Sequence, residues 1–205
     1  DKMIEAVEFD IGKVLLDFDY SIFVKKMAKK SRCNEVDLNV YLNQSPLLAK
    51  YESGFLSSFE FFERVRKETG FVGSEADFAK LFEDIFTPIS GMIDIHQKIA
   101  NSGIRTYTFS NTNEMAVRYI SRNYGFWGNF SDHVLSHKVG ALKPQSKIYE
   151  VLEEISGLQG AKIAYVDDLP LNCKAGRDRG WQVCCHTDPE SSYKFFKELG
   201  LLSPS

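Results

Sequence analysis

The chain has 205 residues, of which 43% are hydrophobic and 26% charged, and its 25 basic and 28 acidic side chains give a net charge of −3. This composition is typical of a folded globular protein and gives no basic footprint for nucleic acid. No apolar run approaches the roughly 18 residues that a membrane-spanning helix needs. The length suits one domain, or one domain with a large insertion.

The cysteines and the N-terminus bear on the compartment. The four cysteines form no C-x-x-C pair, which argues against a zinc site, and they are too few for a disulfide framework at this length. The N-terminal residues also lack a signal-peptide pattern. We therefore expect a cytoplasmic protein with reduced thiols and with neither a membrane nor a nucleic acid among its partners.

Apolar segments with the composition of buried strands recur along the chain, and helical patterns follow several of them. One such pattern covers Met92–Ala100 and another covers Ser146–Ile155. This alternation predicts an α/β fold with a parallel sheet of about five strands and right-handed crossovers. The predicted strands are Met3–Asp10, Ile104–Ser110, His133–Ser136, Lys162–Asp167 and Gln182–His186.

The stretch between the first two predicted strands is too long for one crossover helix. We expect residues 19–90 to be almost entirely helical, because apolar residues there recur at helical spacing and Ser57 with Glu60 resembles a capping box. The sequence thus predicts a helical domain, residues 19–90, inserted into a core made of residues 1–18 and 91–205. The clearest apolar helix face consists of Phe78, Leu81, Phe82 and Ile85.

Polar residues follow the predicted strands at the points where these end. Asp10 ends the first strand, Ser110 the second, and the pair Asp167 and Asp168 the fourth, while Lys143 precedes the helix after the third. In a parallel sheet these groups converge on the carboxyl edge, where ligands bind. Three carboxylates there form a hard oxygen site suited to Mg²⁺, and a lysine can offset the charge of a transferring phosphoryl group. A carboxylate beside the metal can act as the nucleophile.

Four ordered motifs resemble those of the haloacid dehalogenase (HAD) superfamily, and the likeness covers nearly the whole chain. The segment inserted after the first motif resembles the helical cap of these enzymes. Its residues Tyr51–Gly54 are similar to caps of the sugar-1-phosphatase and epoxide-hydrolase N-domain branch. The motifs are FDIGKVLLDFD from Phe9, FSNT from Phe109, SHKVGALKP from Ser136 and VDDLPLN from Val166.

The resemblance implies roles for the residues of the first and fourth motifs. Asp10 would be the nucleophile that forms an aspartyl-phosphate and would also bind Mg²⁺. The backbone carbonyl of Gly12 would be a second ligand, with Asp168, aided by Asp167, completing the metal site. Asn172 would orient the fourth loop.

The same resemblance assigns the phosphate-binding residues. Ser110 and the backbone of Asn111 would hold phosphate oxygens. Lys143 would offset charge on both the nucleophile and the phosphoryl group. The helical cap would close over the site and select the substrate.

Three residues around the nucleophile depart from the family pattern. Most HAD phosphatases have an acid–base Asp where this chain has Gly12, and the branch with a Phe-Asp-x-Gly start shares this lack. Lys13 replaces the usual Gly or Asn and would either reach toward the phosphate or point outward. Glu8 points to the same face of its strand as Asp10, so we expect a basic or hydrogen-bonding partner for it.

The leading hypothesis is therefore a Mg²⁺-dependent phosphatase acting on a small phosphomonoester such as a sugar phosphate. Two alternatives stay open. One is a catalytically weak HAD-like module that binds a phosphorylated ligand or a protein. The other is a metal-independent 2-haloacid dehalogenase, a subclass that generally has an aromatic residue at the position of Gly12.

Overall fold

The computed structural model describes residues 3–43 and 45–204. Its central element is a five-stranded parallel sheet with the strand order β5-β4-β1-β6-β7. The five predicted strands are confirmed, and each observed strand lies within the segment predicted for it or starts one residue before it. The strands are β1 (Ala6–Phe9), β4 (Arg105–Ser110), β5 (Asp132–Leu135), β6 (Ile163–Asp167) and β7 (Gln182–Cys185).

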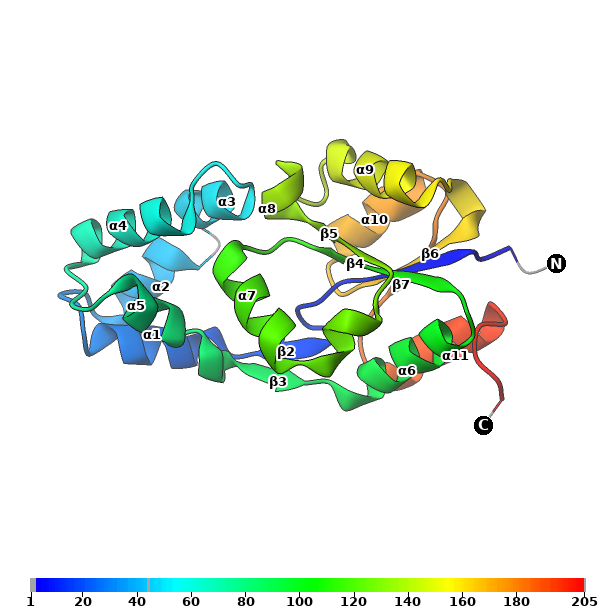
Figure 1. Ribbon diagram of the computed structural model, residues 1–205, viewed down its shortest axis with the longest axis horizontal. Coiled ribbons are helices and arrows are strands. Elements are labelled where there is room, and N and C mark those ends of the chain that lie inside the picture. Colours follow the sequence, from blue (N-terminus) through cyan, green and yellow to red (C-terminus); the bar gives the residue numbers. More distant parts are fainter. Residues whose placement is uncertain (1–2, 44, 205) are drawn as a thin grey trace.

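Helices cover both faces of this sheet (Figure 1). On one face, Phe9 packs with Ile95 of α6 and Phe196 of α11 in a single apolar cluster. On the other face, Phe109 and Tyr165 pack with Tyr149 of α9 in a second cluster. Burial on both faces is why β6, the run Ile163–Asp167, is apolar up to its final aspartate and does not alternate. The core helices are α6 (Ser90–Asn101), α7 (Glu114–Asn123), α8 (Ser136–Val139), α9 (Ser146–Ser156), α10 (Pro170–Asp178) and α11 (Pro189–Glu198).

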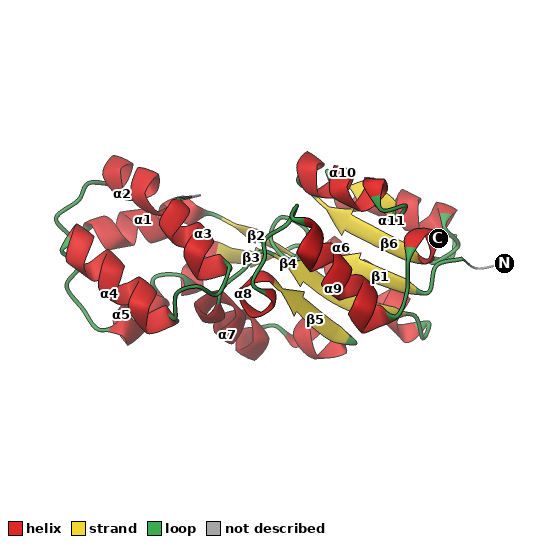
Figure 2. Cartoon of the chain, turned by 90° about the horizontal axis from the view of Figure 1, so that it is seen from above, coloured by secondary structure: helices red, strands yellow, loops and turns green. Residues whose placement is uncertain are grey.

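The helical insertion, which comprises helices α1 to α5 and the short 3-10 helix η1, lies beyond the carboxyl ends of the strands (Figure 2). It has its own core, in which Phe23, Phe61 and Phe78 are fully or almost fully buried. Ser57 and Glu60 form the predicted capping box at the start of α4. The elements are α1 (Tyr20–Ala28), α2 (Glu35–Leu42), α3 (Pro46–Glu52), α4 (Ser58–Thr69), α5 (Glu75–Lys80) and η1 (Glu83–Ile85).

Two details of the predicted insertion are wrong. The continuous helix face over residues 78–85 is broken, because α5 ends at Lys80 and a turn separates it from η1. The segment before Ser90 also contains a strand, β3 (Phe86–Pro88), which pairs antiparallel with β2 (Leu16–Phe18). That pairing joins residues about 70 positions apart, so a local helical pattern gives no sign of it. The two strands form the connection between the helical insertion and the sheet (Figure 1).

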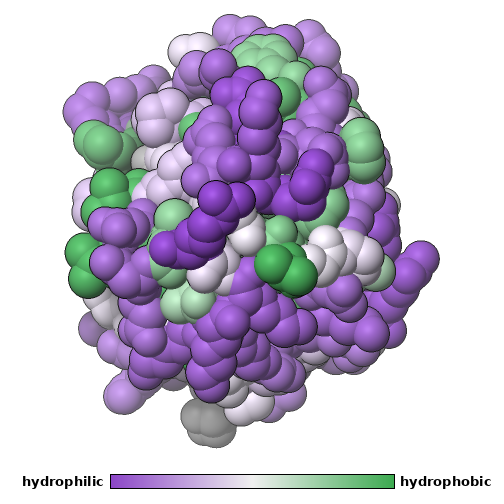
Figure 3. Space-filling model, turned by 90° about the vertical axis from the view of Figure 1, so that its left-hand side faces the viewer, coloured by the Kyte–Doolittle hydropathy of each residue, from purple (hydrophilic) through white to green (hydrophobic). Residues whose placement is uncertain are grey.

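The outer end of the helical insertion is mostly hydrophilic, with separate small hydrophobic areas (Figure 3). The exposed large apolar side chains of the insertion include Val36, Val40 and Val72. Scattered apolar side chains are usual on a protein surface. Within the described residues, no helix combines the length and apolarity that crossing a bilayer would require.

Candidate active site

Three aspartates meet at the carboxyl edge of the sheet. Asp10 follows β1, and Asp167 and Asp168 lie at the end of β6, the strand next to it. Each of the three offers one carboxylate oxygen, and these oxygens lie within 4.8 Å of one another. The strand ends thus bring together the three carboxylates that the sequence places at a single edge. The helical insertion lies beyond these strand ends (Figure 2).

Lys143 lies between two of these carboxylates. Its Nζ is 2.7 Å from Oδ2 of Asp167 and 3.3 Å from Oδ1 of Asp10, and it donates to the carbonyl of Phe109 at 2.7 Å. Its side chain is only 1% exposed. Burial alone would lower the pKa of Lys143, but the two carboxylates outweigh it and raise the pKa above its usual value. Lys143 is therefore a fixed positive charge beside Asp10.

Asp167 is held as an anion by a full set of donors. Its Oδ1 accepts from the backbone N–H of Leu169 at 2.9 Å, and its Oδ2 accepts from the hydroxyl of Tyr165 and from Nδ2 of Asn172 at 3.3 Å. Burial opposes ionisation, but Lys143 and these hydrogen bonds keep the pKa of Asp167 below its usual value. Asn172 thus has the orienting contact expected of it. The sequence pattern gave no signal for Tyr165, which lies within an apolar run.

Asp10 and Asp168 are the two carboxylates without such support. Asp10 is 8% exposed and accepts from the backbone N–H of Ile11 at 2.8 Å. Burial and the charges of Asp167 and Asp168 raise the pKa of Asp10, although Lys143 opposes this. Burial and Asp167 also raise the pKa of Asp168. The excess negative charge and the all-oxygen donor set fit a hard divalent cation, which would favour both ionised forms.

The loop after β4 carries the predicted phosphate-binding residues. Ser110 is 3% exposed and lies at the end of β4, beside β1. The side chain of Asn111 holds the backbone of Lys143 at both ends: Oδ1 accepts from its N–H at 2.7 Å, and Nδ2 donates to its carbonyl at 3.1 Å. Sequence analysis expected only the backbone of Asn111 to act. Its side chain is what connects the loop after β4 to the loop that carries Lys143.

The flap (residues 11–18) follows Asp10 and leads into the helical insertion. Gly12 packs against the ring of Phe18, and a Cβ at position 12 would lie 2.9 Å from Cε1 of that ring. Lys13 has a positive φ of 66°. Its Nζ binds Oδ1 of Asp17 at 2.7 Å and the carbonyl of Phe18 at 3.0 Å, so the lysine folds back on the flap. This contact decides between the two expectations for Lys13 in favour of the outward one.

The expected partner of Glu8 is absent. Within residues 3–43 and 45–204, neither carboxyl oxygen of this fully buried side chain has a hydrogen-bond partner. In the sheet Glu8 lies between Tyr107 and Tyr165, and the guanidinium of Arg105 donates to the carbonyl of Ser156 at 2.8 Å. Burial raises the pKa of Glu8 well above its usual value, and the charge of Arg105 offsets this only in part.

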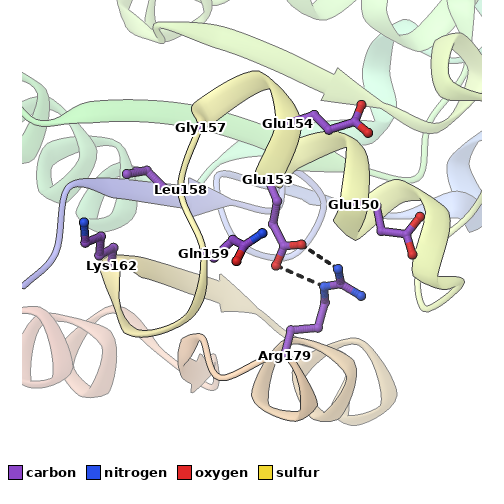
Figure 4. Close-up of a pocket in the computed structure, with 8 residues that line it drawn as sticks. All are labelled: Glu150, Glu153, Glu154, Gly157, Leu158, Gln159, Lys162 and Arg179. Carbon is purple, nitrogen blue, oxygen red and sulfur yellow. Dashed lines mark hydrogen bonds and ion pairs between the residues drawn. The ribbon is translucent and has the colours of Figure 1, made fainter.

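The surface also has a hollow of about 650 Å³ between α9, α10 and the segment before β6 (Figure 4). None of the predicted site residues lines it. Glu153, at its centre, accepts from Nε of Arg179 at 3.1 Å and from Nε1 of Trp181 at 3.0 Å. Its central charges are thus already paired within the fold, and we do not include it in the candidate site.

Several known structures have a similar fold. No protein-family model matches the chain. A HAD-family enzyme from Bacteroides thetaiotaomicron, solved with magnesium and inorganic phosphate, aligns over 90% of this chain and 95% of its own, with a TM-score of 0.81 and 19% identity. A HAD-like hydrolase from Porphyromonas gingivalis aligns over 96% and 98%, with a TM-score of 0.81 and 20% identity.

A dehalogenase is a more distant match. L-2-haloacid dehalogenase from Xanthobacter autotrophicus aligns over 88% of this chain and 76% of its own, with a TM-score of 0.62 and 16% identity. The narrower branch suggested by Tyr51–Gly54 stays a prediction. The parallel sheet in the order β5-β4-β1-β6-β7 agrees with the fold of these matches. The chain has the fold of the haloacid dehalogenase superfamily.

Proposed function

We propose that the protein is a Mg²⁺-dependent phosphatase that hydrolyses a small phosphomonoester through an aspartyl-phosphate on Asp10. The observation that carries the proposal is the position of Lys143, whose Nζ lies 3.3 Å from Oδ1 of Asp10 and 2.7 Å from Oδ2 of Asp167. A buried cation beside a carboxylate offsets the charge that gathers when this carboxylate attacks a phosphoryl group.

Magnesium would be held by Asp10, Asp168 and the backbone carbonyl of Gly12, with Asp167 aiding them. When bound, the ion would supply positive charge to the phosphoryl oxygens. Asp167 already accepts from Lys143, Tyr165 and Leu169, so its main contribution is to fix Lys143.

The remaining roles belong to the chain's own groups. Oδ2 of Asp10 is the attacking atom, since Oδ1 accepts from the N–H of Ile11 and faces Lys143. Ser110 and the backbone of Asn111 hold phosphate oxygens, and the side chain of Asn111 keeps Lys143 in register with them. The helical insertion, predicted to span residues 19–90, acts as the cap that limits the substrate to a small phosphorylated metabolite.

The three-aspartate cluster favours this function over dehalogenation. A dehalogenase needs a nucleophilic carboxylate but no metal, and three carboxylate oxygens within 4.8 Å carry more negative charge than Lys143 alone offsets. The likeness to the phosphate-bound Bacteroides enzyme, at a TM-score of 0.81, also exceeds the likeness to the Xanthobacter dehalogenase, at 0.62.

The test is phosphate release from a panel of small phosphomonoesters, with Mg²⁺ and with EDTA, beside Asp10→Asn and the exposed control Asp178→Asn. We expect release that needs Mg²⁺, disappears in Asp10→Asn and persists in Asp178→Asn. Halide release from 2-chloropropionate, measured in parallel, would instead support the dehalogenase. A folded protein that binds Mg²⁺ but releases neither product would be a binding module.

A further inference from the structure

The proposed reaction needs a proton donor that the flap does not provide. An alkoxide leaving group departs slowly unless a proton reaches its oxygen, and a positioned general acid contributes about 10²–10⁴-fold. Gly12 has no side chain, and Phe18 fills the space beside it. Lys13 is bound to Asp17 and to the backbone of the flap. A proton donor for the leaving group must therefore come from another element around the carboxyl edge.

Glu52 lies where the helical insertion meets this edge. It is the last residue of α3, which packs against α8, the helix directly after β5 (Figure 1). Two residues further on, a Cβ at Gly54 would lie 2.2 Å from the carbonyl oxygen of His137 in α8, so this turn is in close contact with the core. Glu52 is thus anchored beside the loop that follows β5.

On its other side, Glu52 approaches the end of the flap. Burial and the nearby Glu52 carboxylate raise the pKa of Tyr20, the first residue of α1 and two residues beyond Phe18. The flap continues β1, and α8 continues β5. In the sheet, β4 lies between β1 and β5. Glu52 therefore lies between α8 and the end of the flap. This position is close to the ends of β4 and β1, which carry Ser110 and Asp10.

The surroundings of Glu52 keep its carboxyl available. Across the described part of the chain, no hydrogen bond or ion pair reaches it, and burial alone raises its pKa to about 7. Its place at the C-terminal end of a helix also disfavours the negative form. Glu8, another buried carboxyl with a raised pKa, lies inside β1 among core side chains and not at the edge. Near neutral pH, Glu52 can therefore both give and take a proton.

We propose that Glu52, from the helical insertion, is the general acid that protonates the leaving group, a role that Gly12 cannot perform. This inference rests on the proposed phosphatase function. Oδ2 of Asp10 attacks phosphorus, the bond from phosphorus to the ester oxygen breaks, and that oxygen keeps the electron pair and takes the proton of Glu52. Water then attacks phosphorus and its protons leave with the phosphate, while the Glu52 carboxylate regains a proton from the solvent. The bond to Asp10 breaks, phosphate leaves, and both side chains return to their starting forms.

A pair of esters separates this role from substrate binding. p-Nitrophenyl phosphate has a leaving group that departs unprotonated, whereas 2-glycerophosphate releases an alkoxide that needs a proton. We expect Glu52→Gln to lower kcat for 2-glycerophosphate by about 100-fold or more and to leave kcat for p-nitrophenyl phosphate within a few-fold. The matched control is Glu83→Gln, an exposed carboxylate in η1 of the same insertion. Circular dichroism and the melting temperature establish that both variants fold.

Three outcomes would overturn the inference. Equal losses on the two esters would assign Glu52 to binding or to cap structure, and a rise in KM with kcat unchanged would assign it to binding alone. Unchanged rates on both esters would remove it from the reaction. If the wild-type protein hydrolyses neither ester, the proposed function itself fails. That failure is recognisable separately, because p-nitrophenyl phosphate needs Asp10 but not Glu52.

Discussion

The ring of Phe18 occupies the space into which a side chain at position 12 would extend, since Cε1 lies 2.9 Å from the Cβ that Gly12 lacks. Lys13 reinforces the arrangement, because its Nζ lies 4.5 Å above the same ring. The flap is therefore built around a glycine, and the missing acid–base residue at this position is part of its packing.

This packing predicts a coupling between positions 12 and 18. Gly12→Ala should lower the free energy of unfolding by about 1–3 kcal/mol, as overpacking does, because the ring must move. Phe18→Leu should relieve the clash, so the double variant should lose less than the sum of the two single changes. Urea denaturation of the four proteins measures the coupling. Additive losses would mean that Phe18 is free to move.

Lys143 should matter for folding as well as for activity. Lys143→Met leaves the buried charges of Asp10 and Asp167 without their counterion, so we expect a loss of about 3–5 kcal/mol in the free energy of unfolding. The matched control is Lys162→Met, which removes a lysine that is 59% exposed and 3.3 Å from Glu5. Exposed pairs contribute about 0–1 kcal/mol. Similar losses in the two variants, measured by urea denaturation, would contradict the buried network.

Glu8 should be a site where an apolar residue stabilises the protein. Because neither of its oxygens has a partner within the described residues, Glu8→Leu should raise the free energy of unfolding by about 1–3 kcal/mol, the cost of an unsatisfied buried polar group. Glu8→Gln, which keeps two unpaired polar atoms, should gain less. Thermal and urea denaturation measure both. A loss of stability in Glu8→Leu would reveal a hydrogen-bond partner for the carboxyl.

The buried ring of His96 should make the free energy of unfolding depend on pH. The ring is fully buried, is stacked on Phe130 and bonds to Oγ1 of Thr106 at 2.9 Å, and burial lowers its pKa to about 4. In the unfolded chain the pKa is about 6.5, so between these values only the unfolded state binds the proton. The contribution of the neutral ring is complete above about pH 6.5 and is lost as the pH falls toward 4.

The expected size of this effect is set by one proton. The free energy of unfolding should fall by about 1.4 kcal/mol per pH unit between pH 6 and 5 on account of His96. His96→Phe keeps an aromatic ring against Phe130 but cannot titrate, so its slope should be smaller by that amount. Denaturant titrations at each pH measure the two slopes. Equal slopes would show that the ring of His96 takes up its proton in the folded state.

Magnesium should stabilise the folded protein through Asp10 and Asp168. At a concentration 100 times its dissociation constant, a ligand that binds only the folded state adds about 2.7 kcal/mol. We expect Mg²⁺ to raise the melting temperature, EDTA to reverse the rise, and Asp168→Asn to abolish it. Asp178→Asn, a change at an exposed carboxylate of α10, should behave as the wild type. A shift that persists in Asp168→Asn would place the ion elsewhere.

The sequence predicted those parts of the site that depend on strand ends. Asp10, Ser110 and Asp167 each end a buried strand, so a parallel sheet must bring them together once its order is set. The support of Asp167 by Tyr165 was not predictable, because a tyrosine within an apolar run has the pattern of any core residue. The strand Phe86–Pro88 was not predicted either, because it is a strand only through its pairing with the distant segment Leu16–Phe18.

For Glu8, the sequence predicted a contact that is not found among the described residues. A carboxylate in a buried strand indicates a partner, but Arg105, whose charge acts on the pKa of Glu8, is committed to the carbonyl of Ser156. Whether a side chain is free for a given contact depends on its competing contacts, which no spacing along the chain records. The side chain of Asn111 was missed in the same way, because its two bonds to Lys143 join segments 32 residues apart.

The antiparallel pair β2 and β3 has one more consequence. Because Phe18 pairs with Phe86, the chain leaves the sheet and returns to it at neighbouring points. The whole helical insertion is therefore a side branch, and the sheet does not depend on it for strand order or register. Replacing residues 19–85 with a short turn between these two phenylalanines would preserve the main-chain path of the core. The junction is thus a natural site for exchanging one helical module for another, with the strand order of the sheet left unchanged.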